Sequence, residues 1–262
     1  MQDDASGSHA REGLIRIRNM EVLEMASTQQ LIPQYYPAEP TVFDNLSAHV
    51  VSGQDASRNQ FPYQISLRVI SGHSSQHICG GSIINQRWVL SAAHCTYGYA
   101  ASVFRVTAGI LSQYDNGVAN QQTVAVSNII NHHAYNSSNP SGTATVSGWR
   151  SIGYPTNAAA TILQFAHVPI LDQVQCAKVI TSLSGSNTPF RPDLNVCTTT
   201  RSSTSRESVC SGDSGGPLVL NNLLVGIVSW GYYPCGNPNY PSVYVHVAAY
   251  RNWISSSTFG EL

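Results

Sequence analysis

Charged side chains are scarce in this sequence, and the two signs nearly cancel. Charged residues make up 10% of the 262 residues, and the formal net charge at pH 7 is -1. One lysine, Lys178, accompanies twelve arginines, and no basic stripe runs along the chain. Because nucleic acids bind to concentrated cationic surfaces, no nucleic-acid partner is expected. No apolar stretch is long enough to span a bilayer, so no membrane association is expected either.

The sequence also lacks a Cys-x-x-Cys pair, which argues against a metal site. It contains six cysteines, an even number that fits an oxidised disulfide framework with fifteen pairings open. Disulfides indicate an extracellular, secreted protein. Residues 1–30 nevertheless contain no apolar core of a signal peptide. The hydrophobic fraction of 42% is enough for two modest cores.

The most informative segment is Cys210–Pro217, which reads CSGDSGGP. Glycine lets the backbone adopt positive φ and approach a bound group closely. The amides of Gly212 and Ser214 are therefore candidates for an oxyanion hole, as acyl transfer requires. A Gly-x-Ser-x-Gly pattern alone would indicate only a turn, and the eight-residue pattern is far more specific.

A second motif lies upstream at Trp88–Cys95, which reads WVLSAAHC and follows Cys79-Gly80-Gly81-Ser82. With the first motif, it makes residues from about 50 to 254 strongly resemble the trypsin/chymotrypsin family of serine endopeptidases. The resemblance implies His94 as general base and Ser214 as nucleophile, acting on protein or peptide substrates without a cofactor.

Alternating apolar residues such as Ile65, Leu67 and Val69 indicate many short strands and an all-β fold. The segments 218–220 and 223–230, joined by two asparagines, read as a hairpin. Residues 247–257 are the best helix candidate. The resemblance implies two antiparallel Greek-key barrels of six strands with a C-terminal helix, in a monomer with the active site between the barrels. The expected bounds are 50–258 for the protease domain, about 50–136 for the first barrel, about 143–246 for the second and about 247–257 for the helix.

The resemblance also selects one disulfide pairing from the fifteen. The expected bonds are Cys79–Cys95, Cys176–Cys197 and Cys210–Cys235.

Residues 1–49 show no strand or helix periodicity and are expected to be a largely disordered prosegment. Val50-Val51-Ser52-Gly53 resembles the N-terminus that cleavage of a zymogen releases, although the same residues also fit a plain strand. In the first interpretation the freed ammonium of Val50 pairs with Asp213. His49 precedes the cut, and no Lys or Arg lies between Asn19 and His49, so a trypsin-like activator is excluded.

A carboxylate that orients the histidine is missing. No Asp or Glu lies between Asp115 and Asp172, and neither of these matches the family position. Residues 137–142 (SSNPSG) replace the expected acidic strand; fully extended they span about 20 Å, enough only to link the barrels. The first barrel is therefore expected to lack its last strand and to be open or unstable.

The resemblance places the base of the substrate pocket at Ser208, six residues before the nucleophile. An acid at this position would select basic side chains, and Glu207 beside it reads as a surface residue. The absence of an acid predicts a chymotrypsin- or elastase-like preference for apolar P1 groups. The expected pocket residues are Ser208, Val209, Ser229, Trp230, Gly231 and Ser242.

Two functions follow from these residues. The first is a serine endopeptidase zymogen that acts through Ser214 and His94. The alternative is a non-catalytic protease homologue that binds a partner, which the missing acid favours.

Overall fold

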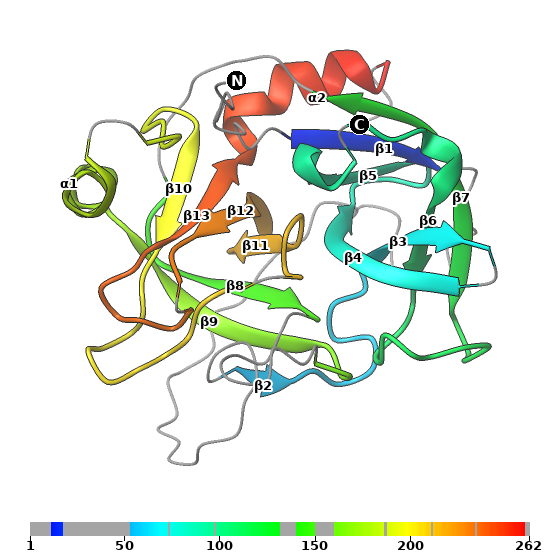
Figure 1. Ribbon diagram of the computed structural model, residues 1–262, viewed down its shortest axis with the longest axis horizontal. Helices are drawn as coiled ribbons and strands as arrows, with labels where there is room; N and C mark the ends of the chain where they lie inside the picture. The colour runs from blue at the N-terminus through cyan, green and yellow to red at the C-terminus, as the bar shows by residue number, and fades with distance from the viewer. Residues whose placement is uncertain are drawn as a thin grey trace, which may run out of the picture.

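Two β-barrels lie side by side in the computed structural model, and helix α2 lies near β1 and β5 of one of them (Figure 1). The structure describes residues 12–17, 53–72, 74–96, 98–131, 140–149, 160–185, 188–210, 212–233 and 235–259. The all-β fold with two barrels and a C-terminal helix is confirmed.

The first barrel is closed, with its strands in the order β1-β5-β4-β3-β6-β7. Apolar side chains on alternating positions of β3, among them Ile65 and Leu67, are fully buried in its core. All five residues of β5 are buried. The strands are β1 (Glu12–Ile17), β3 (Gln64–Ser71), β4 (Ser74–Ile83), β5 (Trp88–Ala92), β6 (Phe104–Ala108) and β7 (Gln122–Asn131), and the short 3-10 helices are η2 (Ala93–Cys95) and η3 (Ala101–Val103).

Strand β1 corrects two expectations from the sequence. It pairs antiparallel with β5, with Glu12 opposite Ala92, and with β7, with Gly13 opposite Asn131. The first barrel is therefore not open, and residues 12–17 are not without secondary structure. The physical reason is that an open barrel would leave two strand edges with unpaired backbone groups. A segment from before the protease domain covers both edges.

The second barrel is a sheet with the strand order β10-β13-β12-β11-β8-β9-β2, and an additional pairing between β9 and β10 closes six of these strands into a ring. In chain order the first strand of this ring is β8 and the last is β13. The strands are β2 (Gln54–Asp55), β8 (Thr143–Gly148), β9 (Gln164–Leu171), β10 (Asn195–Thr198), β11 (Pro217–Leu220), β12 (Leu223–Gly231) and β13 (Ser242–His246).

The hairpin of β11 and β12 has the two-residue turn that the sequence predicts. Asn221 and Asn222 have φ values of 47° and 57°. Positive φ at both turn residues is typical of the type I′ turn, whose twist matches that of the strands, and asparagine tolerates it better than most residues.

The predicted C-terminal helix is confirmed as the 3-10 turn η4 (Val247–Tyr250) followed by α2 (Arg251–Ser257). Ala249, Tyr250 and Ile254 pack into the same core cluster as the first barrel, so the helix ties the chain end to that barrel. A second helix, α1 (Gln173–Ser184), was not predicted. None of the helices in the described ranges is both long and apolar enough to cross a membrane.

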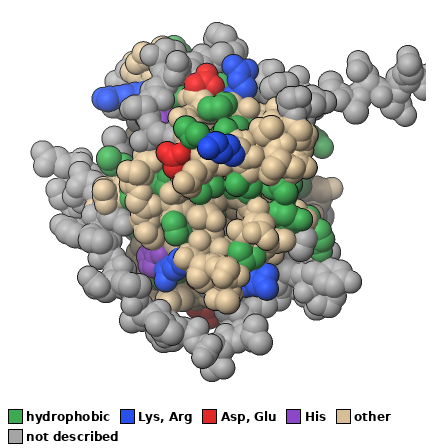
Figure 2. All heavy atoms as spheres, turned by 90° about the vertical axis from the view of Figure 1, so that its left-hand side faces the viewer, with side chains coloured by type: hydrophobic (Ala, Val, Ile, Leu, Met, Phe, Trp, Pro, Cys, Tyr) green, Lys and Arg blue, Asp and Glu red, His purple; other side chains and the backbone are tan. Residues whose placement is uncertain are grey.

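Figure 2 views the side of the molecule on which α1 lies. Its described charged side chains stand apart from one another and do not gather in one patch, and apolar side chains are scattered between polar ones. The sparse charge on this face agrees with the low fraction of charged residues in the sequence.

Candidate active site

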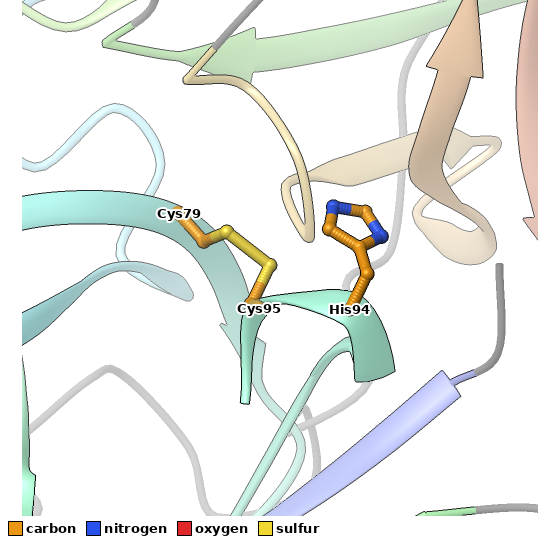
Figure 3. Close-up of side chains that lie close together, drawn as sticks. All are labelled: Cys79, His94 and Cys95. Carbon is orange, nitrogen blue, oxygen red and sulfur yellow. A yellow bond between two sulfur atoms is a disulfide. The ribbon is translucent and has the colours of Figure 1, made fainter. Parts of the chain in front are cut away.

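His94 lies in η2, directly after the buried strand β5. The next residue, Cys95, forms a disulfide with Cys79 on β4, so both sulfur atoms are bonded and neither is a thiolate. Figure 3 shows the His94 side chain beside this disulfide, with β1 passing beneath the segment that carries it. The buried strand and the disulfide together fix the backbone on both sides of the imidazole.

All three predicted disulfides are confirmed, and no described cysteine is free. The bond between Cys210 and Cys235 ties the segment before Ser214 to the loop that follows β12.

The loop that carries Ser214 is held by both barrels. The amide of Gly80 on β4 donates to the Ser214 carbonyl at 2.7 Å, and the amide of Gly215 donates to the Val228 carbonyl on β12 at 2.9 Å. His94 and Ser214 are therefore connected through Cys95, Cys79 and Gly80, by one disulfide and one hydrogen bond. The structure brings the two sequence motifs together in the fold.

Glycine is required after Ser214 for a specific reason. Gly215 has a φ of 79°, and a Cβ atom there would collide with the Ser91 hydroxyl and the Gly80 carbonyl. Gly212 also has positive φ, at 99°. Only at glycine is this backbone geometry unstrained, which explains the glycines on both sides of Ser214.

His77 is a site residue that the sequence analysis missed. Its Nε2 atom lies 3.2 Å from the carbonyl oxygen of Gly212, and its Nδ1 atom lies 2.8 Å from the Ser66 hydroxyl. Its ring meets that of Trp149 edge-on, with centroids 5.8 Å apart. Burial, reinforced by the positive charge of Arg68, lowers the pKa of His77 to about 4. The neutral ring donates through Nε2–H to Gly212 and accepts the Ser66 proton at Nδ1.

The environment of His94 differs from that of an imidazole paired with an acid. The His94 residue is exposed, but partial loss of water around its ring lowers its pKa below the usual 6.5, and no charged group among the described residues opposes this shift. A neighbouring carboxylate would raise the pKa instead. The described residues thus give His94 no acid partner, in agreement with the absence noted in the sequence.

Asp213 is almost fully buried, and its carboxylate accepts the Cys210 amide at 3.0 Å. The glycine at position 148 leaves room for it, since a Cβ there would meet the Asp213 carboxylate. Val50, the predicted partner of Asp213 after cleavage, lies outside the described residues, as do residues 132–139, which include half of the segment that replaces the acidic strand.

All six predicted pocket residues line one cavity of about 250 Å³, and Ser214 lines it too. None of the described residues that line the cavity is charged. Aromatic side chains on one wall belong to residues that the sequence analysis did not include: Tyr232, Tyr233 and Tyr240.

Three hydroxyls in this cavity differ in their surroundings. The Ser208 hydroxyl donates to the Val209 carbonyl at 3.1 Å, and the Ser242 hydroxyl interacts with Tyr244. The Ser229 hydroxyl is buried and has no hydrogen-bond partner among the described residues. Glu207 does not line the cavity; it is half-buried, and one of its carboxylate oxygens is buried without a partner in the described structure.

Two barrels with the His94 and Ser214 motifs held on neighbouring elements are the architecture of a chymotrypsin-type fold. Comparison with known proteins agrees: the family model described as Trypsin matches residues 50–143 and 137–254. Trypsin delta of Drosophila melanogaster is 35% identical over 243 residues, which cover 81% of this chain and 89% of the relative. Trypsin beta of Drosophila erecta is 35% identical over 240 residues, covering 80% and 88%. Trypsin alpha-4 of Lucilia cuprina is 34% identical over 243 residues, covering 81% and 88%. The chain belongs to the trypsin family of serine endopeptidases.

Proposed function

We propose that this chain is a secreted, monomeric serine endopeptidase zymogen that cleaves peptide bonds after apolar residues. The observation that carries the proposal is the cavity beside Ser214, whose described lining contains no charge. A basic P1 side chain would lose its hydration there without gaining an ionic partner, which costs several kcal/mol. An aromatic or branched aliphatic side chain gains from burial against Trp230 and Val209.

In this proposal Ser214 attacks the scissile carbonyl while His94 accepts its proton and then passes it to the leaving amine. The amides of Gly212 and Ser214 stabilise the oxyanion. His77 supports this arrangement because it holds the Gly212 carbonyl, and so the orientation of the peptide group between Gly212 and Asp213.

Activation requires a protease that cuts between His49 and Val50. The new ammonium group then pairs with the Asp213 carboxylate, which in the uncut chain accepts the Cys210 amide. The three disulfides support the secreted location of the protein.

The pocket is tested with peptide substrates that differ only at P1, after cleavage of the chain ahead of Val50. We expect kcat/KM for Phe or Leu substrates to exceed that for Arg. Faster hydrolysis of the Arg substrate would refute the proposed preference.

The second candidate is a non-catalytic homologue that binds a partner. It is supported by the surroundings of His94, since no carboxylate among the described residues raises the pKa of its ring. Covalent labelling of Ser214 by a phosphonylating agent separates the two functions, since only an activated serine reacts.

A further inference from the structure

The first barrel contains a strand that comes from outside the protease domain. β1 precedes the proposed cleavage site, while its two neighbours β5 and β7 follow that site. We propose that residues Glu12–Ile17 are a donor strand that stays in the first barrel after the chain is cut ahead of Val50. The cleaved protein is then a noncovalent complex of the segment 1–49 with the protease domain. This inference rests on the proposed activation cleavage.

The pairing of β1 on both sides is the first argument. Glu12 to Arg16 lie opposite Ala92 to Trp88 of β5, and Gly13 to Ile17 lie opposite residues of β7 from Asn131 to Val126. β1 is therefore a central strand of a closed ring rather than an added edge. Its departure would expose the edges of both neighbours, which is the costly state that barrels avoid.

The composition of β1 is the second argument. Leu14, Ile15 and Ile17 are residues that strands favour. Recognition of an extended peptide by two flanking strands relies on backbone hydrogen bonds for affinity. No covalent bond across positions 49 and 50 is needed for those interactions.

The position of β1 also connects it with the reaction. Its first residue lies opposite Ala92, two positions before His94, and the strand lies against η2, which carries His94. In Figure 3 the start of β1 lies next to this segment. β1 is therefore a positioning element for the general base, and its loss would release the backbone support of His94 on that side.

The experiment uses the full chain with the recognition sequence of a specific protease placed directly ahead of Val50. After complete cutting, native mass spectrometry and size-exclusion chromatography report whether the N-terminal fragment remains bound. We expect a one-to-one complex that survives dilution to micromolar concentration and separates in urea. Dissociation of the fragment from a domain that still unfolds cooperatively would overturn the inference.

Two variants at one position provide the matched control. Leu14→Val keeps the backbone N–H and a strand-favouring side chain, and should retain the fragment. Leu14→Pro removes the N–H and is incompatible with a central strand, so the fragment should be released. If the proline variant does not fold, hydrogen exchange on the cut wild-type protein shows whether β1 stays in the barrel. Amides of Gly13–Arg16 as protected as those of β5 support the inference, and rapid exchange there contradicts it.

These readouts do not depend on catalysis. A Ser214→Ala chain should retain the fragment as well as the wild type does. Retention of the fragment without labelling of Ser214 would refute the proposed activity alone, whereas labelling with a released fragment would refute the donor strand alone.

Discussion

The Nε2 atom of His77 on β4 lies 3.2 Å from the carbonyl oxygen of Gly212, two residues before Ser214. The two residues are separated by 135 positions in the sequence. This hydrogen bond joins the first barrel to the loop that carries the proposed oxyanion amides, and it requires a proton on Nε2.

His77 should make the protein less stable in acid. Burial lowers its pKa in the folded state to about 4, against 6.5 for an unperturbed histidine. Between these values the unfolded chain binds more protons, so stability is complete above pH 6.5 and falls as the pH drops toward 4. The contribution is at most about 3 kcal/mol. Urea unfolding at pH 7 and pH 4.5 measures the loss.

His94, His167 and His246 also have lowered pKa values, so several histidines contribute to the pH dependence of wild-type stability. The variant His77→Gln isolates one of them, because the amide keeps a donor without titrating. We expect a smaller loss of stability in acid for this variant. An unchanged pH dependence would show that His77 is not buried as described.

Because the Ser229 hydroxyl has no described hydrogen-bond partner, the protein should tolerate its removal. Ser229→Ala removes a buried polar atom that has no described partner, so the free energy of unfolding should change by less than about 0.5 kcal/mol or increase. Ser91 is the control, since its hydroxyl donates to the Gly80 carbonyl at 2.8 Å. Ser91→Ala should cost about 1 kcal/mol or more. Equal losses of unfolding free energy for Ser229→Ala and Ser91→Ala, measured by denaturant unfolding, would contradict the absence of a described partner for the Ser229 hydroxyl.

Gly215→Ala should be among the most damaging single substitutions. The alanine would need a left-handed backbone and would collide with the Ser91 hydroxyl and the Gly80 carbonyl. We expect a loss of about 3 kcal/mol or more, from the combined cost of backbone strain and overpacking. Gly72 has a φ of 58° but open space around its Cβ position, so Gly72→Ala should cost only about 1 kcal/mol. Thermal unfolding of the pair tests the difference.

Placing an acid at the proposed pocket base should change the substrate preference. Ser208→Asp gives a basic P1 side chain an ionic partner, worth about 1.5–3 kcal/mol, so the kcat/KM ratio of Arg to Phe substrates should rise about tenfold to a hundredfold. Ser208→Asn, similar in size and uncharged, should leave the ratio near the wild-type value. A similar rise with asparagine would show that charge at position 208 does not determine the preference.

Local patterns predicted much of this structure. The motifs around His94 and Ser214 gave the family, and the turn at Asn221 and Asn222 gave the hairpin. The ends of helix α1 are recognisable in the sequence, because Asp172 caps its first amides and Gly185 follows it with positive φ.

β1 and His77 depend on distant partners. β1 pairs with strands more than seventy residues away, and its six residues do not reveal which strands it will join. His77 reads as a polar residue within a strand, and only the fold brings Gly212 to its ring. These are the features that a single sequence predicts least well, because long-range pairing determines them.

The central claim is that Ser214 is a nucleophile activated by His94, and covalent labelling tests it most directly. The cut chain is treated with a serine-directed phosphonylating agent, and the labelled peptide is identified by mass spectrometry. We predict one label per chain on Ser214, no label in Ser214→Ala, and a large loss of rate in His94→Ala. No label in the cut wild type, or equal rates with and without the imidazole, would contradict the claim.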